Sequence, residues 1–239
     1  LMARLPFRDI AAQDRFAQEH NILVLEARDL DSYHHQAGAM MRIAARARVP
    51  LAVAEDAEVV MFRAEIGGED HFAVLIGKGA DLDAPLVRLH SQCITGDVLG
   101  SLKCDCGDQL QAAMRLMAEN GGGVLIYLAQ EGRDIGLLNK MRAYALQDNG
   151  LDTVDANHAL GFDTDERVFL PAARILDALG IARLRLITNN PDKISQLEQC
   201  GIKVEERVPL TLASNPHNED YLATKKHRTG HMIADKDKG

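Results

Sequence analysis

The second half of the chain alternates short apolar runs with amphipathic helical segments, and this alternation constrains the fold more than any other feature. Residues 108–120 predict a helix that ends at three glycines, and the apolar run 124–128 predicts a buried strand. Alternating strands and helices of these lengths indicate an α/β layer fold. The pattern continues with helices expected at 138–148, 172–179 and 192–200, and strands at 184–187 and 203–208.

Short β-like runs also occupy the first half of the chain. Residues 58–63 and 71–77 are separated by a Gly-Gly pair, which predicts a β-hairpin, and residues 86–90 predict a further strand. A hairpin makes its two strands antiparallel, whereas strands joined through a helix can be parallel. We therefore expect a mixed sheet flanked by helices.

The composition argues against two classes of protein. No apolar run approaches the roughly 20 residues of a membrane-spanning helix, and no secretory signal is visible, so we expect a soluble, cytoplasmic protein without a membrane partner. The net charge of −8 argues against binding to polymeric nucleic acid, which requires clustered basic surface. A single nucleotide could still bind through a few local cations.

Three of the four cysteines, Cys93, Cys104 and Cys106, form a C-x10-C-x-C array. Thiols in a reducing compartment favour metal binding or catalysis over disulfides. Zinc prefers such ligands, and three thiolates suggest a catalytic site that keeps a position open for water. Lys103 could offset thiolate charge. The alternatives are a structural zinc with His90 as fourth ligand, or a buried trio of free thiols; Cys200 is assigned no role.

Two loops follow predicted strands, where α/β sheets bind ligands. The loop that begins at Glu131 reads Glu-Gly-Arg-Asp-Ile-Gly, which is neither a dinucleotide fingerprint nor a P-loop. Its alternative interpretation is a surface ion pair between Glu131 and Arg133, contributing about 0 to 1 kcal/mol. The loop from Thr188 to Lys193 opens a helix with a hydroxyl, amide groups and an ammonium, an arrangement that suits phosphate. Its alternative is an ordinary turn with an exposed lysine.

Taken together, the motifs resemble the GTP cyclohydrolase II family over residues 45–233. Each motif alone is weak, and the triplet from Asp165 to Arg167 is of a kind common on solvated faces, but their agreement in order and spacing is specific. The resemblance rests on Arg88-Leu-His-Ser-Gln-Cys, Cys104-Asp-Cys-Gly-Asp-Gln, Glu131-Gly-Arg-Asp-Ile-Gly-Leu-Leu-Asn-Lys, Arg142-Ala-Tyr-Ala-Leu-Gln-Asp, Asp163-Thr-Asp-Glu-Arg, Thr188-Asn-Asn-Pro and Asn215-Pro-His-Asn-Glu.

The resemblance implies a reaction. Zinc held by the three cysteines activates water for attack on C8 of guanine, and formate is released. Arg167 matches the family residue thought to attack the α-phosphate and release pyrophosphate, and Asp165 matches the proton acceptor. The product is 2,5-diamino-6-(5-phosphoribosylamino)pyrimidin-4(3H)-one, formed in the first step of riboflavin biosynthesis.

The resemblance also implies the binding residues and partners. Tyr144 matches a tyrosine near the reacting ring, where it could orient the water or the opened formamide, or simply pack. Magnesium is expected with the triphosphate, and a homodimer is expected of the family. The residues that match the nucleotide site are Arg88, Leu89, His90, Ser91, Gln92, Gln109, Glu131, Gly132, Arg133, Thr153, Thr188 and Lys193.

One position departs from the family pattern. Gln92 stands where glutamate is expected before the first zinc cysteine, which removes a charge and adds a donor. This departure keeps a second hypothesis open, a catalytically degenerate, zinc-stabilised domain that binds GTP in a regulatory or partner role. A third is a related cyclohydrolase that retains the formyl group.

The N-terminal segment carries a separate, shorter resemblance. Residues 2–6, 16–23 and 29–33 resemble the closing residues of dihydroxybutanone phosphate synthase, a domain often fused upstream of this family. We therefore expect residues 1–44 to be the remnant of such an upstream domain, in a bifunctional protein, and residues 45–233 to form the GTP cyclohydrolase II domain. The polar residues 234–239 are expected to be a mobile tail.

Overall fold

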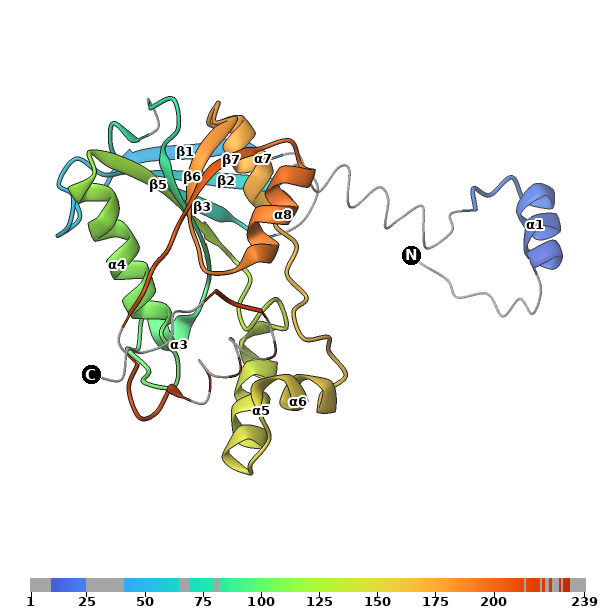
Figure 1. Cartoon of the computed structure of the whole chain (residues 1–239). Coiled ribbons are helices and arrows are strands. Elements are labelled where there is room, and N and C mark those ends of the chain that lie inside the picture. Colours follow the sequence, from blue (N-terminus) through green and yellow to red (C-terminus); the bar gives the residue numbers. More distant parts are fainter. Residues whose placement is uncertain are drawn as a thin grey trace.

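A seven-stranded mixed sheet forms the centre of the computed structural model (Figure 1). The structure describes residues 10–24, 41–64, 69–79, 82–212, 214–219, 221, 224, 228 and 230–232. The strands are β1 (Met41–Arg48), β2 (Glu58–Ala64), β3 (His71–Gly77), β4 (Leu86–Ser91), β5 (Gly122–Leu128), β6 (Arg183–Ile187) and β7 (Lys203–Val208). The helices are α1 (Ile10–Glu19), α3 (Ile94–Asp97), α4 (Cys106–Glu119), α5 (Gly136–Asp148), α6 (Thr153–Ala159), α7 (Leu170–Ala178) and α8 (Pro191–Gln199).

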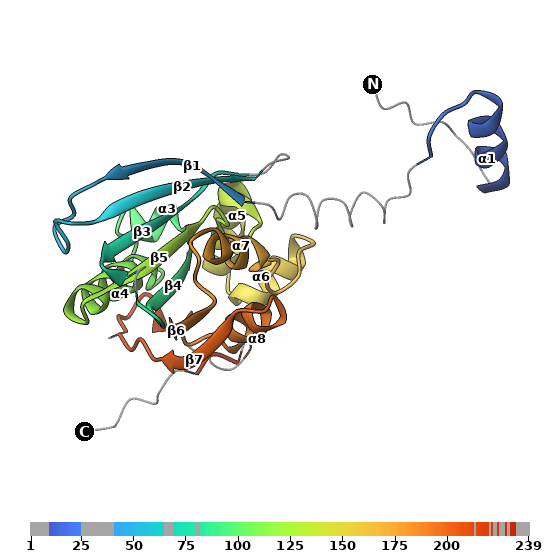
Figure 2. The same cartoon turned by 90° about the horizontal axis from the view of Figure 1, so that it is seen from above.

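The strand order β1-β2-β3-β5-β4-β6-β7 combines two kinds of pairing. From β1 through β2 and β3 to β5 the neighbours are antiparallel, and from β5 through β4 and β6 to β7 they are parallel. Figure 2 shows β1 and β7 at opposite edges. The prediction of an α/β fold with a mixed, helix-flanked sheet is confirmed, as is the pairing of β2 with β3, although their turn lies outside the described residues.

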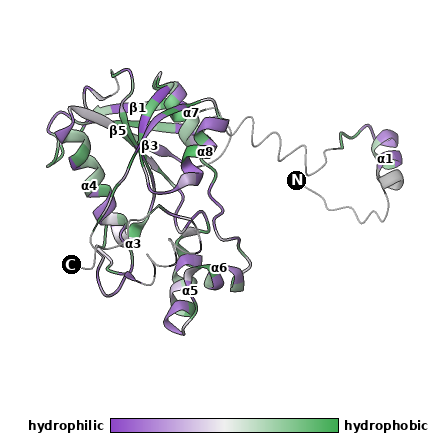
Figure 3. Cartoon of the chain, viewed as in Figure 1, coloured by the Kyte–Doolittle hydropathy of each residue, from purple (hydrophilic) through white to green (hydrophobic). Residues whose placement is uncertain are grey.

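Helices cover both faces of the sheet, because the strands are apolar on both sides. Along β5, Val124 and Ile126 belong to a core cluster with α7 and α8, whereas Leu125 belongs to a second cluster with Met114 and Met117 of α4. This alternation follows from the period of two in a strand. Figure 3 shows hydrophobic residues on parts of α4, α7 and α8. The result is a three-layer arrangement with the sheet in the middle.

Four described elements were not expected from the sequence: α1, β1, α3 and α6. The strand β1 pairs with β2 from Met41 opposite Ala64 to Arg48 opposite Glu58, so it extends across the predicted boundary between residues 44 and 45. Helix α4 begins at Cys106, slightly before its predicted start. In both views α1 lies apart from the sheet (Figures 1 and 2), and the predicted tail 234–239 lies outside the described residues. Among the helices that the structure describes, none is long and apolar enough to cross a membrane.

Candidate functional site

A pocket lies beyond the carboxyl ends of β4, β5 and β6, the edge at which parallel α/β sheets bind ligands. Its walls come from the segments that follow these strands and from α4, α5 and α6. Most of the predicted site residues therefore lie together, although they are far apart in the sequence. Those that line the pocket are Arg88, His90, Ser91, Gln92, Cys93, Cys104, Cys106, Gln109, Gly132, Arg133, Tyr144, Thr153, Arg167, Thr188 and Lys193.

The three predicted cysteines form one cluster. The Sγ atoms of Cys93, Cys104 and Cys106 lie within 4.8 Å of one another, and those of Cys93 and Cys104 are 3.7 Å apart. Two glycines allow this approach. A Cβ at Gly96 would meet the Cys104 Sγ at 2.9 Å, and a Cβ at Gly107 would meet the carbonyl oxygen of Gly96 at 2.3 Å. The tight turn needed to bring a C-x-C pair to one point is thus present.

The donor set of this cluster fits a zinc ion, because zinc favours thiolates. Among the described residues, the cluster contains these three ligands and no fourth. The predicted alternative ligand, His90, is buried, and its Nε2 lies 3.0 Å from both carboxylate oxygens of Asp97. Burial lowers the pKa of His90 although Asp97 acts in the opposite direction. The arrangement favours an open three-thiolate site over a closed one completed by His90.

A lysine that sequence reasoning did not assign contacts the cluster. The Lys140 Nζ donates to the Cys93 Sγ at 3.0 Å and to the Glu131 Oε1 at 2.8 Å. Lys103, which we expected to offset thiolate charge, instead pairs with Asp148 at the surface. Hydrogen bonds from the Cys104 and Cys106 thiols, and then from Lys140, lower the pKa of Cys93. Helical spacing could have indicated this lysine: Lys140 stands four residues before the predicted Tyr144 on α5, and residues at this spacing lie on the same face of a helix.

Glu131 does not form the surface ion pair that was one interpretation of its loop. Its carboxylate is buried and accepts hydrogen bonds from Lys140, from the Ile94 N–H at 2.7 Å and from the Gly132 N–H at 3.1 Å. Arg133 instead donates to the Thr164 carbonyl at 2.8 Å. Glu131 is not among the pocket-lining residues, and its predicted contact with guanine stays a prediction.

The backbone of this loop is strained. Gly132, Arg133 and Asp134 have φ angles of 65°, 62° and 75°, three consecutive residues in the left-handed region. Non-glycine residues adopt this conformation at a cost of roughly 1 to 2 kcal/mol each. The turn points the loop back onto α5, where a Cβ at Gly132 would lie 3.1 Å from the Lys140 Cβ. The strain therefore accompanies the close packing of the loop against Lys140.

Buried cations line the same pocket. The Lys193 Nζ donates to the Leu89 carbonyl at 2.7 Å and lies 5.2 Å from the centre of the Phe169 ring, so the interpretation of an exposed lysine is wrong. Leu89 is fully buried and is not among the pocket-lining residues, so its predicted contact with the nucleotide stays a prediction. Arg88 donates to the Ile187 carbonyl at 3.0 Å and to Gln109. Burial lowers the pKa of Arg88 to about 10, which still leaves it charged near neutral pH.

Asp165 and Arg167 form an ion pair beside these cations. The side chains of Arg167 and Asp165 are only 13% and 28% exposed, so these two residues do not lie on a solvated face, whereas Glu166 between them is exposed. Arg167 also donates to the Ser91 Oγ at 3.3 Å. Although burial acts in the opposite direction for each group, the pairing lowers the pKa of Asp165 and raises the pKa of Arg167. Asp165 is not itself among the lining residues.

The predicted Tyr144 and Thr153 lie in the same pocket. The Tyr144 ring has the Lys103 and Lys140 ammonium groups 5.1 and 5.7 Å from its centre, and burial raises the pKa of its hydroxyl. Thr153 is the first residue of α6, whose N-terminus is capped by Asp152. Further lining residues were missed in the sequence: Asp105, Gln130, Ile135, Lys140, Ala143, Gln147, Asn157, Asn189, Asn190, Leu210, Thr211, Leu212, Tyr221 and His231.

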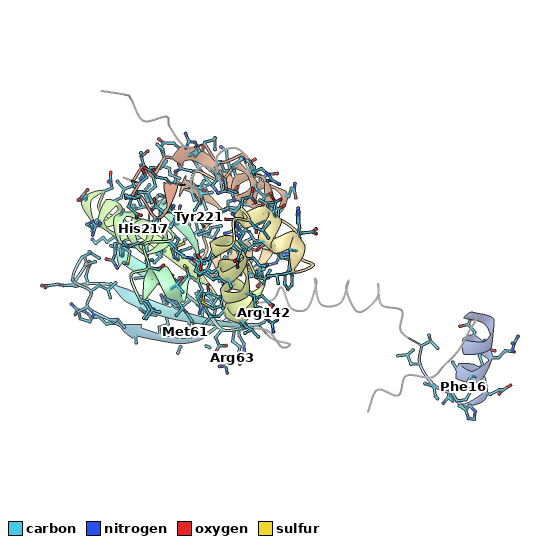
Figure 4. The ribbon with its side chains drawn as sticks, turned by 90° about the horizontal axis from the view of Figure 1, so that it is seen from below. Phe16, Met61, Arg63, Arg142, His217 and Tyr221 are labelled. Atoms are coloured by element: carbon cyan, nitrogen blue, oxygen red, sulfur yellow. The ribbon has the colours of Figure 1, made fainter. Side chains whose placement is uncertain are left out.

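The C-terminal segment supplies part of the wall. Tyr221 and His231 line the pocket, and Figure 4 shows Tyr221 in the middle of the body when it is viewed from below. Arg228 pairs with Asp152 at 2.6 Å and with Asp155 at 3.2 Å, which ties this segment to α6. The Met232 N–H donates to the Asn189 carbonyl at 2.8 Å. Individual residues of this segment gave no separate signal in the sequence.

The fold and pocket define an α/β protein whose candidate site joins a three-thiolate metal-binding group to buried cations. Residues 41–209 match the family model described as GTP cyclohydrolase II. The chain belongs to the GTP cyclohydrolase II family, a family of hydrolases.

Relatives named GTP cyclohydrolase-2 support this assignment. The chain is 52% identical over 218 residues to one from Azospirillum brasilense, covering 91% of this chain but only 57% of that relative. It is 54% identical over 166 residues to one from Shigella boydii, covering 70% and 85% of the two chains. It is 50% identical over 190 residues to one from Salmonella typhimurium, covering 80% and 96%.

One solved structure is similar at a low level. It is RibBX, described as a two domain 3,4-dihydroxy-2-butanone 4-phosphate synthase from A. baumannii, with a TM-score of 0.42 and 19% identity. The match covers 89% of this chain and 51% of that chain. A likeness of this size carries no argument about fold or function.

Proposed function

We propose that the chain is a zinc-dependent GTP cyclohydrolase II, which opens the imidazole ring of GTP in the first step of riboflavin biosynthesis. The observation that carries this proposal is that a three-thiolate cluster and the buried cations Arg88, Arg167 and Lys193 line one pocket. A metal-activated water needs the first group, and a triphosphate needs the second. Family membership supports the same reaction.

Cys93, Cys104 and Cys106 would hold the zinc ion. When bound, the ion lowers the pKa of water and so supplies hydroxide near neutral pH, for attack on C8 of guanine and release of formate. Tyr144 lines the same pocket and orients the water or the opened formamide. Gln92 and His90 line the same pocket as the first cysteine, and both would border the base.

The buried cations would receive the triphosphate. Arg88 and Lys193 neutralise phosphate oxygens, with Thr188 and Arg133 as further donors. An Arg167 nitrogen attacks the α-phosphorus, its proton passes to Asp165, and the bond from the α-phosphorus to the pyrophosphate oxygen breaks. Hydrolysis of the Arg167 adduct then gives the phosphoribosyl product, 2,5-diamino-6-(5-phosphoribosylamino)pyrimidin-4(3H)-one.

The proposal has further parts that rest on the family and on the residues. Magnesium accompanies the pyrophosphate oxygens, because a triphosphate otherwise brings unneutralised charge to an acidic protein. A cytoplasmic location suits a cluster that needs reduced cysteines. We also propose a homodimer, and an upstream dihydroxybutanone phosphate synthase-like domain to which residues 1–44 belong, in a bifunctional protein. Mass measurement of the native gene product tests the last point.

Mass-resolved analysis of the products from GTP tests the proposed function. With zinc and magnesium, the expected products are formate, pyrophosphate and the diaminopyrimidine, and Cys104→Ser should abolish formate release. GTP binding without turnover by the zinc-loaded protein would instead support the degenerate, zinc-stabilised domain that Gln92 suggests. A product that keeps the formyl group would identify the variant cyclohydrolase.

A further inference from the structure

We infer that Lys140 is a positioning residue of the metal site, which holds the Cys93 thiolate and offsets the negative charge of the three-thiolate cluster, so that zinc binds more tightly. This inference rests on the proposed zinc site. It assigns a role to the lysine of the Asn-Lys pair on α5, which neither the proposed reaction nor the nucleotide site uses.

Lys140 is buried and has anionic partners on two sides. Its residue is 8% exposed, and its Nζ lies 3.0 Å from the Cys93 Sγ and 2.8 Å from the Glu131 Oε1. A lysine is rarely buried unless its charge is paired. The two contacts pair the ammonium of this buried side chain with a carboxylate and a thiolate.

The charges of the cluster explain why an ammonium is needed there. Three thiolates with one zinc ion carry one net negative charge, and Glu131 brings a second negative charge to the same point. Such charges interact strongly away from water. Lys140 places a positive charge in contact with both anions. Without this ammonium, the thiolates and Glu131 would lie together with no compensating positive charge, and the affinity for zinc would fall.

Lys140 also reaches the backbone of the first cysteine through Glu131. The second carboxylate oxygen of Glu131 accepts from the N–H of Ile94, the residue that follows Cys93. The Cys93 N–H in turn donates to the Asp97 Oδ2 at 3.0 Å. The ammonium therefore fixes Cys93 both at its sulfur and, through Glu131, at the adjoining peptide. Supports of this kind orient metal ligands.

Lys103 provides a matched control within the same chain. Its ammonium lies 5.1 Å from the Tyr144 ring centre, compared with 5.7 Å for Lys140. Its side chain is 42% exposed, however, and its ion pair is with the exposed Asp148. Replacing either lysine removes one positive charge beside Tyr144, but replacing Lys140 alone removes a contact to the thiolates. A difference between the two variants isolates that contact.

The experiment measures zinc affinity by competition with a chromophoric chelator. Lys140→Met and Lys140→Gln should weaken zinc binding by roughly 10- to 100-fold, the loss typical of supporting groups around metal ligands. Lys140→Arg, which keeps the charge and donors, should recover part of the affinity, and Lys103→Met should bind zinc as the wild type does. Circular dichroism of the zinc-free proteins checks that each variant is folded.

Cobalt substitution gives a second readout that a merely structural lysine would not move. A thiolate that loses a hydrogen bond and a neighbouring positive charge releases its electrons more easily. The thiolate-to-cobalt charge-transfer band should therefore move to longer wavelength in Lys140→Met and Lys140→Gln and return toward the wild-type position in Lys140→Arg. The band of Lys103→Met should stay unchanged.

The outcomes separate this inference from the proposed function. A wild-type protein that binds zinc and releases formate, but whose folded Lys140→Met and Lys140→Gln variants keep wild-type zinc affinity and an unchanged cobalt band, would overturn the role of Lys140 alone. If the wild type binds zinc but releases no formate from GTP, the proposed function fails while the Lys140 comparison still decides this inference. A wild type without zinc affinity would overturn both.

Discussion

Arg167 binds Asp165 through two parallel hydrogen bonds, with Nε 2.7 Å from Oδ1 and NH2 2.5 Å from Oδ2. A third nitrogen, NH1, reaches the Ser91 Oγ at 3.3 Å. Bidentate pairing fixes the orientation of a guanidinium as well as its charge. The carboxylate is therefore positioned to take a proton from the side chain for which we propose attack on phosphorus.

Arg167→Ala should impair pyrophosphate release from GTP far more than formate release. The expected loss is roughly 100-fold or more, because the variant lacks both the proposed nucleophile and a charge at the α-phosphate. Separate assays of formate and pyrophosphate measure it. Arg174→Ala serves as control, since Arg174 pairs with Asp177 on the surface at 3.0 Å and should leave both products unchanged. Equal losses of formate and pyrophosphate in Arg167→Ala would contradict the assigned role.

Asp134→Gly should stabilise the protein by about 1 kcal/mol in the free energy of unfolding, because glycine removes the left-handed strain at this position. Asp134 is exposed and has a φ of 75°. Chemical denaturation measures the change. Asp134→Ala removes the same carboxylate but keeps a Cβ, so it should not gain this stability. If both variants are stabilised equally, the cause is charge and not backbone conformation.

The stability of the fold should fall as the pH drops through the region of the unfolded histidine pKa, in part because of His71. This side chain is buried, and its Nδ1 accepts from the Ala129 N–H at 3.1 Å. Burial lowers the pKa of His71, so the unfolded state takes up a proton at a higher pH than the folded state. His71 therefore contributes to the free energy of unfolding above the histidine pKa of the unfolded state, about 6.5. Below that pH its contribution decreases, by at most about 1.4 kcal/mol per pH unit.

His71→Asn tests this pH dependence, because asparagine offers an acceptor that does not titrate. Urea denaturation at about pH 7.5 and about pH 5.5 should show a smaller loss of stability for the variant than for the wild type. His217→Asn is the control, since His217 is exposed (labelled in Figure 4). If His71→Asn loses as much stability between the two pH values as the wild type does, groups other than His71 cause the pH dependence.

Arg228→Ala should raise the KM for GTP by only a few-fold, because ion pairs exposed to solvent are weak. Arg228 joins the C-terminal segment to Asp152 and Asp155, beside Thr153 in the pocket wall. Steady-state kinetics measure the change. Arg183→Ala is the comparison, because its pairs with Asp83 and Glu205 involve β6 and β7 and no pocket residue. An equal KM effect in both variants would argue against a role for this attachment.

The order of strands and helices could be predicted because buried elements carry a periodic apolar pattern. The strand β1 lacks that pattern: seven of its eight residues are exposed, and Arg42, Arg46 and Arg48 are among them. Edge strands often carry such charges, which discourage pairing with other chains. The short helix α6 has a cap at Asp152 but only seven residues, too few for a clear amphipathic repeat.

The candidate site could be predicted where the chemistry lies in the residue type itself. Clustered thiols indicate metal binding, and arginines and a helix N-terminus indicate anion binding, from the sequence alone. Lys140 does not, because lysine on a helix is ordinarily exposed, and its burial depends on Glu131 and Cys93, which come from other segments. The contact between His90 and Asp97 could not be predicted either, because the two residues meet only in the folded chain. Such pairings arise only when the chain is folded.

The contribution of Tyr221 and His231 to the pocket has a practical consequence for making and labelling this protein. A bulky label attached to this C-terminal segment would lie close to the pocket wall. An assay of the labelled protein would then measure a pocket that the label itself has altered. Labels are better attached to α1, which lies apart from the sheet in both views (Figures 1 and 2) and contributes no residue to the pocket lining.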